Sequence, residues 1–249
     1  MPVLKQITKS ATALIALLSL ITAPLHADIA FSESDFENGT YTVGQMLTTS
    51  PPEPGSSFAV SSSRFTAQGH GNFILQQFQL YHASGDFNFI SQPIFVNDFV
   101  YDTQTEGAIE SLSASMKVFP VANNLAVTVG HAYLIVEQND RFYRGYIDGF
   151  FTNIDETTFS LGNMTETDFI EFSDTGLNGD SHPDFDSGQL RFGFSTAMSN
   201  TGLSYNENYL LISAFDDLNI RIDSAPVPEP ASLSLLSLGT LALLRRTHR

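Results

Sequence analysis

Apolar and polar residues alternate with a period of two through most of the stretch from 57 to 222. In the clearest example, 110–118, serines and a lysine alternate with four apolar residues: Leu112, Ala114, Met116 and Val118. Successive side chains of a β-strand point to opposite faces of its sheet. The pattern therefore predicts a strand whose apolar side chains face a core and whose serines and Lys117 face solvent.

The same period predicts further strands at 73–82, 126–137, 142–150, 189–195, 209–215 and 218–222. The stretch 94–101 is largely apolar on both faces, as is typical of a strand inside a sandwich. Stretches rich in Gly, Asn, Asp and Pro separate them, as expected for turns. No segment between them has a convincing helical period. The predicted fold is therefore all-β, an antiparallel β-sandwich.

The final stretch contains Phe215-Asp216-Asp217-Leu218 and resembles the last strand of concanavalin-type and carbohydrate-module jelly rolls. The resemblance implies a jelly-roll-like sandwich of two curved sheets, often with a bound Ca²⁺ and a concave face that binds glycans. Adjacent residues of a regular strand point to opposite faces, so Asp216 and Asp217 are not expected to form an acid/base pair. A structural role is favoured for both.

The first 27 residues have the order of a secretory signal peptide. Lys5 and Lys9 precede an apolar stretch at 11–21, and Ala27 offers a small residue at the expected cleavage site. The apolar stretch is short for a membrane span, so we expect export through the secretion translocon followed by cleavage. The alternatives are a buried N-terminal helix and an uncleaved anchor.

Acidic residues dominate the middle of the chain. Residues 28–228 contain six Lys and Arg against 26 Asp and Glu, a net charge of −20. Such a surface repels nucleic acid and anionic membranes, so we expect no binding to nucleic acid. The chain also has no cysteine, so no disulfide can stabilise the exported domain.

The C-terminal segment combines three features in a fixed order. Prolines at 226, 228 and 230 favour an extended backbone, the 13 residues 232–244 carry no charge, and arginines close the chain. A helix of that length is about 20 Å long, short of a hydrocarbon core of roughly 30 Å. The arginines are expected to stay on the cytoplasmic side. This is the plan of a membrane handle that a protease removes.

The tail resembles a PEP-CTERM sorting signal: Pro228-Glu229-Pro230, a transmembrane helix at 233–244, and Arg245-Arg246. The resemblance implies a Gram-negative bacterium, an exosortase-type protease, transient membrane insertion, and delivery to the cell surface or extracellular polysaccharide matrix. It implies nothing about the middle of the chain, and an ordinary terminal anchor is the alternative. The predicted organisation is a signal peptide (1–27), a β-sandwich domain (28–224) and a sorting signal (225–249).

The densest acidic segment is 174–186. Four of its side chains are candidate Ca²⁺ ligands on a Gly-rich loop: Asn178, Asp180, Asp184 and Asp186. Their spacing does not match an EF-hand. The alternative is a solvated turn whose Asp and Asn side chains cap their own backbone. The histidines have no zinc-binding spacing, and zinc is not expected.

The aromatic-rich stretch 141–151 is a candidate binding surface. Alternation places Tyr143 and Ile147 on one face of this strand and four residues on the other: Phe142, Arg144, Tyr146 and Asp148. Aromatic rings stack on sugar rings, and Arg and Asp side chains hydrogen-bond to hydroxyl groups. The pattern predicts a glycan-binding face formed by Arg144, Tyr146 and Asp148. The alternative is a core strand with an ordinary solvated face.

No catalytic motif is present. The sequence lacks a Gly-x-Ser-x-Gly elbow and the carboxylate spacing of laminarinase-like enzymes of the concanavalin fold. We therefore predict an exported, surface- or matrix-sorted, non-catalytic β-sandwich that binds extracellular polysaccharide. The alternatives are a structural matrix protein without a defined ligand and a polysaccharide-active enzyme whose carboxylates come from separate strands.

Overall fold

A computed structural model describes these residues: 28–37, 40–48, 55, 57–67, 71–82, 90–123, 129–151, 156–173, 176–198 and 206–225. They belong to one compact unit, Asp28–Ala225. The predicted signal peptide with Ala27, and the predicted tail with Pro228, Glu229, Pro230, Arg245 and Arg246, lie outside the described residues. Among the residues that the structure describes, no helix is long and apolar enough to cross a membrane.

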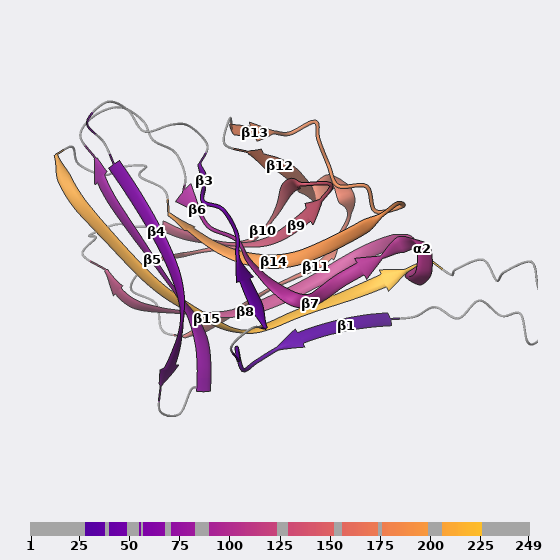
Figure 1. Cartoon of the computed structure of the whole chain (residues 1–249), viewed down its shortest axis with the longest axis horizontal. Helices are drawn as coiled ribbons and strands as arrows, with labels where there is room; N and C mark the ends of the chain where they lie inside the picture. The colour runs from indigo at the N-terminus through magenta and orange to yellow at the C-terminus, as the bar shows by residue number, and fades with distance from the viewer. Residues whose placement is uncertain are drawn as a thin grey trace, which may run out of the picture. The chain divides into compact units, whose positions relative to one another are not determined.

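The described strands form two sheets in which every pairing is antiparallel (Figure 1). Sheet A has the order β11-β8-β15-β5-β4, and β1 also pairs with β15. Its strands are β1 (Asp28–Glu33), β4 (Ser57–Ala67), β5 (Gly71–His82), β8 (Ile109–Asn123), β11 (Thr157–Met164) and β15 (Glu207–Ser224).

Sheet B has the order β13-β12-β10-β9-β14-β6-β3, and β14 also pairs with β7, which pairs with β2. Its strands are β2 (Tyr41–Val43), β3 (Leu47–Thr48), β6 (Ile90–Ser91), β7 (Ile94–Asp102), β9 (Val129–Gln138), β10 (Arg141–Phe151), β12 (Phe169–Ser173), β13 (Gly176–Asn178) and β14 (Gln189–Met198). The helical segments described are α2 (Thr103–Glu106) and η1 (Glu166–Asp168).

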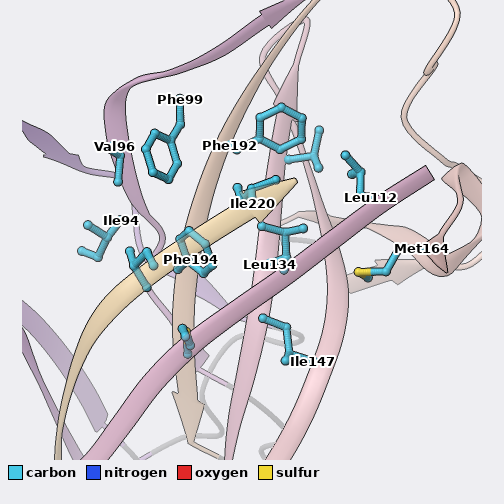
Figure 2. Close-up of a cluster of buried hydrophobic side chains, with 14 of the residues drawn as sticks. Ile94, Val96, Phe99, Leu112, Leu134, Ile147, Met164, Phe192, Phe194 and Ile220 are labelled. Carbon is cyan, nitrogen blue, oxygen red and sulfur yellow. The ribbon is translucent and has the colours of Figure 1, made fainter. Parts of the chain in front are cut away.

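The two sheets pack face to face around one large apolar core. Figure 2 shows part of it, with side chains from both sheets pointing toward one another: Ile94, Val96, Phe99, Leu112, Leu134, Ile147, Met164, Phe192, Phe194 and Ile220. The alternation predicted for 110–118 is confirmed, because Leu112, Ala114, Met116 and Val118 are all buried in this core. The predicted fold class, a jelly-roll-like antiparallel sandwich, is confirmed as well.

A polar layer separates this core from a smaller apolar cluster that contains Phe78 and Leu211. The centre of the polar layer is Gln76 of β5, which is fully buried. The Gln76 Oε1 atom accepts hydrogen bonds from the backbone N–H of Thr196 (3.0 Å) and from its hydroxyl (2.7 Å). Thr196 belongs to β14, so this side chain links sheet A to sheet B through satisfied buried polar groups.

The last strand differs from the prediction. The sequence predicts two strands at 209–215 and 218–222, but β15 is one strand with a register shift between Asp216 and Asn219. Asp217 has a positive φ of 49° there, as expected for a bulge that inserts an extra residue and interrupts the alternation. Because of the bulge, Asp216 pairs with Lys117, and Asp217 lies 3.7 Å from the same ammonium group. The expectation that these carboxylates point to opposite faces is therefore wrong.

Candidate functional site

The outer face of sheet B, which points away from the sandwich core, is formed mainly by β9, β10 and β14. A two-residue turn joins β9 to β10, and Asn139 and Asp140 adopt φ values of 54° and 61° there. Two positive φ values are typical of a type I′ hairpin turn, which sets the register of the two strands. The register places Tyr146 opposite Tyr133, and Arg191 of β14 opposite Glu137.

Three aromatic side chains meet on this face, and we call them the aromatic cluster: His131, Tyr133 and Tyr146. The ring centroids of Tyr133 and Tyr146 are 5.6 Å apart, and the His131 ring lies 5.8 Å from Tyr146 and 6.0 Å from Tyr133. Tyr133 is 6% exposed, whereas Tyr146 is 49% exposed. The cluster thus presents one open ring supported by a buried one.

Arg144 packs against the cluster from the same strand as Tyr146. Its guanidinium carbon lies 5.0 Å from the centroid of Tyr133 and 5.3 Å from that of Phe172 on β12. Contacts of this length are favourable cation–π interactions. They hold the Arg144 side chain in a fixed position beside Tyr146.

Burial controls the protonation of these groups. It raises the pKa of Tyr133 to about 12, although the positive charge of Arg144 acts in the opposite direction. Burial also lowers the pKa of His131, and the charge of Arg144 lowers it further. At neutral pH the cluster is therefore an uncharged platform next to one fixed positive charge.

A second arginine lies further along the face. The Arg191 guanidinium carbon lies 4.6 Å from the centroid of Phe95, and its Nη1 atom lies 3.3 Å from Glu137 Oε2. Gly193, the next outward-facing position of β14, is required for this arrangement: a Cβ there would lie 2.5 Å from the Ile94 carbonyl oxygen and 2.7 Å from the Phe95 ring. Arg191 is therefore paired with a carboxylate, whereas Arg144 is held by aromatic rings.

The structure brings together part of the predicted glycan-binding face. Alternation placed Arg144 and Tyr146 on the same face, and both side chains pack with Tyr133. The pairing of β10 with β9 shifts register between Tyr146 and Asp148, so the alternation that grouped Asp148 with them is interrupted. The side chain of Asp148 lies outside the described residues.

Sequence reasoning missed the partners of Arg144 and Tyr146. His131 and Tyr133 lie on β9, and Phe172 lies on β12. The one available signal was local, because His131 and Tyr133 share a face of their own strand. Their position opposite β10 depends on the hairpin register, which the alternation of a single strand does not determine.

The acidic loop predicted to bind Ca²⁺ forms a hydrogen-bonded turn at 184–187. Asp184 accepts hydrogen bonds from the Asp186 N–H (2.9 Å) and the Ser187 hydroxyl (2.6 Å), and the latter bond is the main reason why its pKa is lowered. The Gln138 amide donates to the carbonyl oxygens of Asp184 and Ser187, both at 2.8 Å.

Asp180 and Asp186 are exposed, and the side chain of Asn178 lies outside the described residues. In the part of the chain that the structure describes, no group of three or more His, Asp or Glu side chains is placed to hold a metal ion. Ca²⁺ binding in this loop stays a prediction.

The comparisons with known proteins identify the tail. The family model of the PEP-CTERM protein-sorting motif matches residues 226–249, which confirms the predicted sorting signal. The motif implies export and a surface or extracellular location. No curated protein matches the chain in sequence.

Three solved structures are similar to the domain. The first is the CBM22-1–GH10 modules of Clostridium thermocellum xylanase 10B with bound xylohexaose, at 7% identity over 83% of this chain and 30% of that chain, with a TM-score of 0.33. The second is the CBM22-1 xylan-binding domain of Paenibacillus barcinonensis Xyn10C, at 15% identity over 82% of this chain and 99% of that chain, with a TM-score of 0.32. The third is a family 30 carbohydrate-binding module, at 9% identity over 81% of this chain and 92% of that chain, with a TM-score of 0.36. This chain thus spans less than a third of the first structure. The fold assignment itself rests on the strand order and the core described above.

Proposed function

We propose that this exported protein binds an extracellular polysaccharide, without catalysis, through the outer face of sheet B. The observation that carries the proposal is the aromatic cluster, in which the half-exposed ring of Tyr146 is supported by His131 and Tyr133 beside Arg144. Carbohydrate rings present apolar C–H groups on their faces and hydroxyl groups at their edges. An open aromatic ring next to a fixed donor group matches both.

The rigidity of the platform supports this role. Binding loses affinity when side chains must be ordered in the complex. Tyr133 is buried beneath the exposed ring, and Arg144 is held between two aromatic rings, so little ordering remains to be done. Tyrosine and arginine, together with tryptophan, are also enriched among the residues that dominate binding energy at protein–protein interfaces.

The charge of the domain indicates which polysaccharide to expect. With a net charge of −20 over residues 28–228, the protein repels polyanions at low ionic strength. On the proposed face, Arg191 is neutralised by Glu137. We therefore propose an uncharged glycan as the ligand.

Calorimetric titration of the purified protein with short, uncharged oligosaccharides and with the extracellular polysaccharide of its host tests the proposal. Saturable binding is expected, and Tyr146→Ala should weaken it at least about tenfold, because the stacking surface is lost. With the short oligosaccharides, each of which occupies one site at a time, Phe65→Ala is the matched control, because Phe65 is 55% exposed but lies on β4 of sheet A. Equal loss in both variants would contradict the proposed site.

The same titration separates the alternative functions. The absence of saturable heat with every glycan would favour a structural matrix protein without a defined ligand. Release of new sugar ends from a bound glycan would favour a polysaccharide-active enzyme. Repeating the titration in EDTA tests the Ca²⁺ hypothesis: lost binding would support a role for the loop 178–186, and unchanged binding would leave that loop as a turn capped by Asp184.

A further inference from the structure

Strand β4 forms one edge of sheet A. Its eleven residues pair with β5 in one unbroken register, from Ser57 opposite Tyr81 to Ala67 opposite Gly71. Among the described residues, β4 pairs with no other strand. Its second side therefore presents a regular row of backbone N–H and C=O groups, which can pair with another strand.

The other described strands that pair on one side alone differ from β4. β1 has six residues, of which Asp28 and Glu33 are acidic, and β2 has three residues. β11, at the opposite edge of sheet A, has eight residues and a register shift between Leu161 and Met164, and Asn163 adopts a φ of 57° there. In sheet B, β3 and β13 have only two and three residues. Irregularity and short length are the devices by which proteins prevent edge pairing, and β4 has neither.

Charged side chains do not protect β4 either. Its only charged residue is Arg64, whose Nη1 atom lies 3.4 Å from the backbone oxygen of Phe36 and is thus directed onto its own chain. The exposed positions of the strand are Ser57, Ala59, Ser61, Ser63, Phe65 and Thr66, and of these only Phe65 has a large side chain. Small side chains allow another backbone to approach.

An exposed aromatic ring lies at this edge. Phe65 is 55% exposed and its ring centroid is 6.1 Å from that of Phe73, which in turn is 5.2 Å from Phe119. The row of rings begins inside sheet A and ends on β4. A strand paired with the free side of β4 would cover Phe65, the exposed end of this row of rings.

The distribution of charge indicates which strand would pair with the free side of β4. Two copies of a domain with a net charge of −20 repel each other over most of their surfaces. β4 has no acidic residue and one arginine, so it is a stretch along which two copies can approach at little electrostatic cost. An antiparallel pair of identical strands also has two-fold symmetry, which satisfies both edges at once and closes the assembly.

We propose that β4 pairs antiparallel with β4 of a second copy of this chain and joins two A sheets into one. A register centred on Ser61 places Ser61 opposite its counterpart, Phe65 opposite Ser57, and Arg64 opposite Phe58. No like charges face each other in this register. The outer face of sheet B takes no part in the contact, so the proposal is independent of glycan binding.

Sedimentation and light scattering of the purified protein over a range of concentrations test this pairing. We expect the mass of a dimer, and Ser61→Lys should raise the dissociation constant at least about tenfold, because two lysines would face each other. Ser160→Lys is the matched control at an exposed serine of β11, and it should leave the dimer intact. A monomer at every concentration, or dissociation by Ser160→Lys alone, would overturn the proposal.

Cysteine cross-linking provides a test that does not depend on destabilisation. The chain has no cysteine, so a disulfide formed by a single introduced cysteine must join two copies. Ala59→Cys, Ser61→Cys and Ser63→Cys are compared under mild oxidation, with Ser160→Cys as the control. We expect a covalent dimer from the β4 series, strongest at the position that faces its counterpart. No covalent dimer from any of the three would overturn the pairing.

Discussion

A buried carboxylate lies at the bulge of β15. Asp216 is 6% exposed, and burial raises its pKa to about 6. The N–H of Asp217 and the charge of Lys117 oppose this shift, while the charges of Asp217 and Asp35 add to it. The folded domain therefore holds a proton on Asp216 at mildly acidic pH, where the unfolded chain has already lost it.

The stabilisation of the domain by Asp216→Asn, relative to the wild type, should be larger at pH 8 than at pH 5. The pKa of the folded state lies above that of the unfolded state, so this group's contribution to stability is lost as pH rises through about 6. Asparagine does not ionise and so removes that loss. The free energy of unfolding of the variant, relative to that of the wild type, should therefore rise by about 1 kcal/mol from pH 5 to pH 8. Urea unfolding at both pH values measures the difference. Asp98→Asn, at an exposed position, should show no such gain, and an equal gain there would refute the assignment to Asp216.

At the level of strands, the alternation of apolar and polar residues identified strands that face the common core, such as the segment around Leu112. It did so because a strand with one buried face needs an apolar residue at every second position. It did not identify bulges. The shifts at Tyr146/Asp148 and Asp216/Asn219 leave the composition of each strand unchanged while reversing the faces beyond them. The alternation of one strand predicts which of its own side chains share a face, but not which residues of the neighbouring strand lie opposite them. Tyr146 on β10 was therefore predicted as part of the site, and Tyr133 on β9 was not.

The link between the sheets also depends on an interaction that no local pattern predicts. Gln76 occupies an inward position of β5 and bonds to Thr196 of β14, 120 residues away. Gln76→Ala should lower the free energy of unfolding by about 2–4 kcal/mol, because the buried Thr196 groups lose their partner. Urea unfolding measures the loss. Gln79→Ala, at an exposed position of the same strand, should change stability by less than about 0.5 kcal/mol, and similar losses in both variants would contradict the special role of Gln76.

For the whole molecule, the sorting motif at 226–249 determines the destination, whereas the proposed glycan binding belongs to the folded unit Asp28–Ala225. The proposed glycan face and the proposed β4 contact lie on different sheets. A dimer joined through β4 would therefore offer two glycan-binding faces, and two sites on one particle increase avidity for a repetitive polymer without any new contact.

The destination can be tested on the protein from its native host. We expect the exported form to lack the signal peptide and residues 233–249, because a PEP-CTERM motif implies that an exosortase-type protease removes the apolar segment after Pro228-Glu229-Pro230. Intact mass spectrometry of the extracellular fraction measures this. A Pro228→Ala, Pro230→Ala variant should remain with the membrane and keep its tail. A wild-type protein that retains residues 233–249 outside the cell would exclude processing.

The position of β15 has a consequence for the order in which the protein is made. This strand is the last of the domain, yet it lies inside sheet A and pairs with β1, β5 and β8. Until residue 224 has emerged from the translocon, β1 and β8 have no common neighbour and β5 lacks its inner partner. Contacts between such distant parts of a chain form slowly. We therefore expect the pairings at the centre of sheet A to form only after the whole domain has been made, so that β15 closes the sheet as its last step.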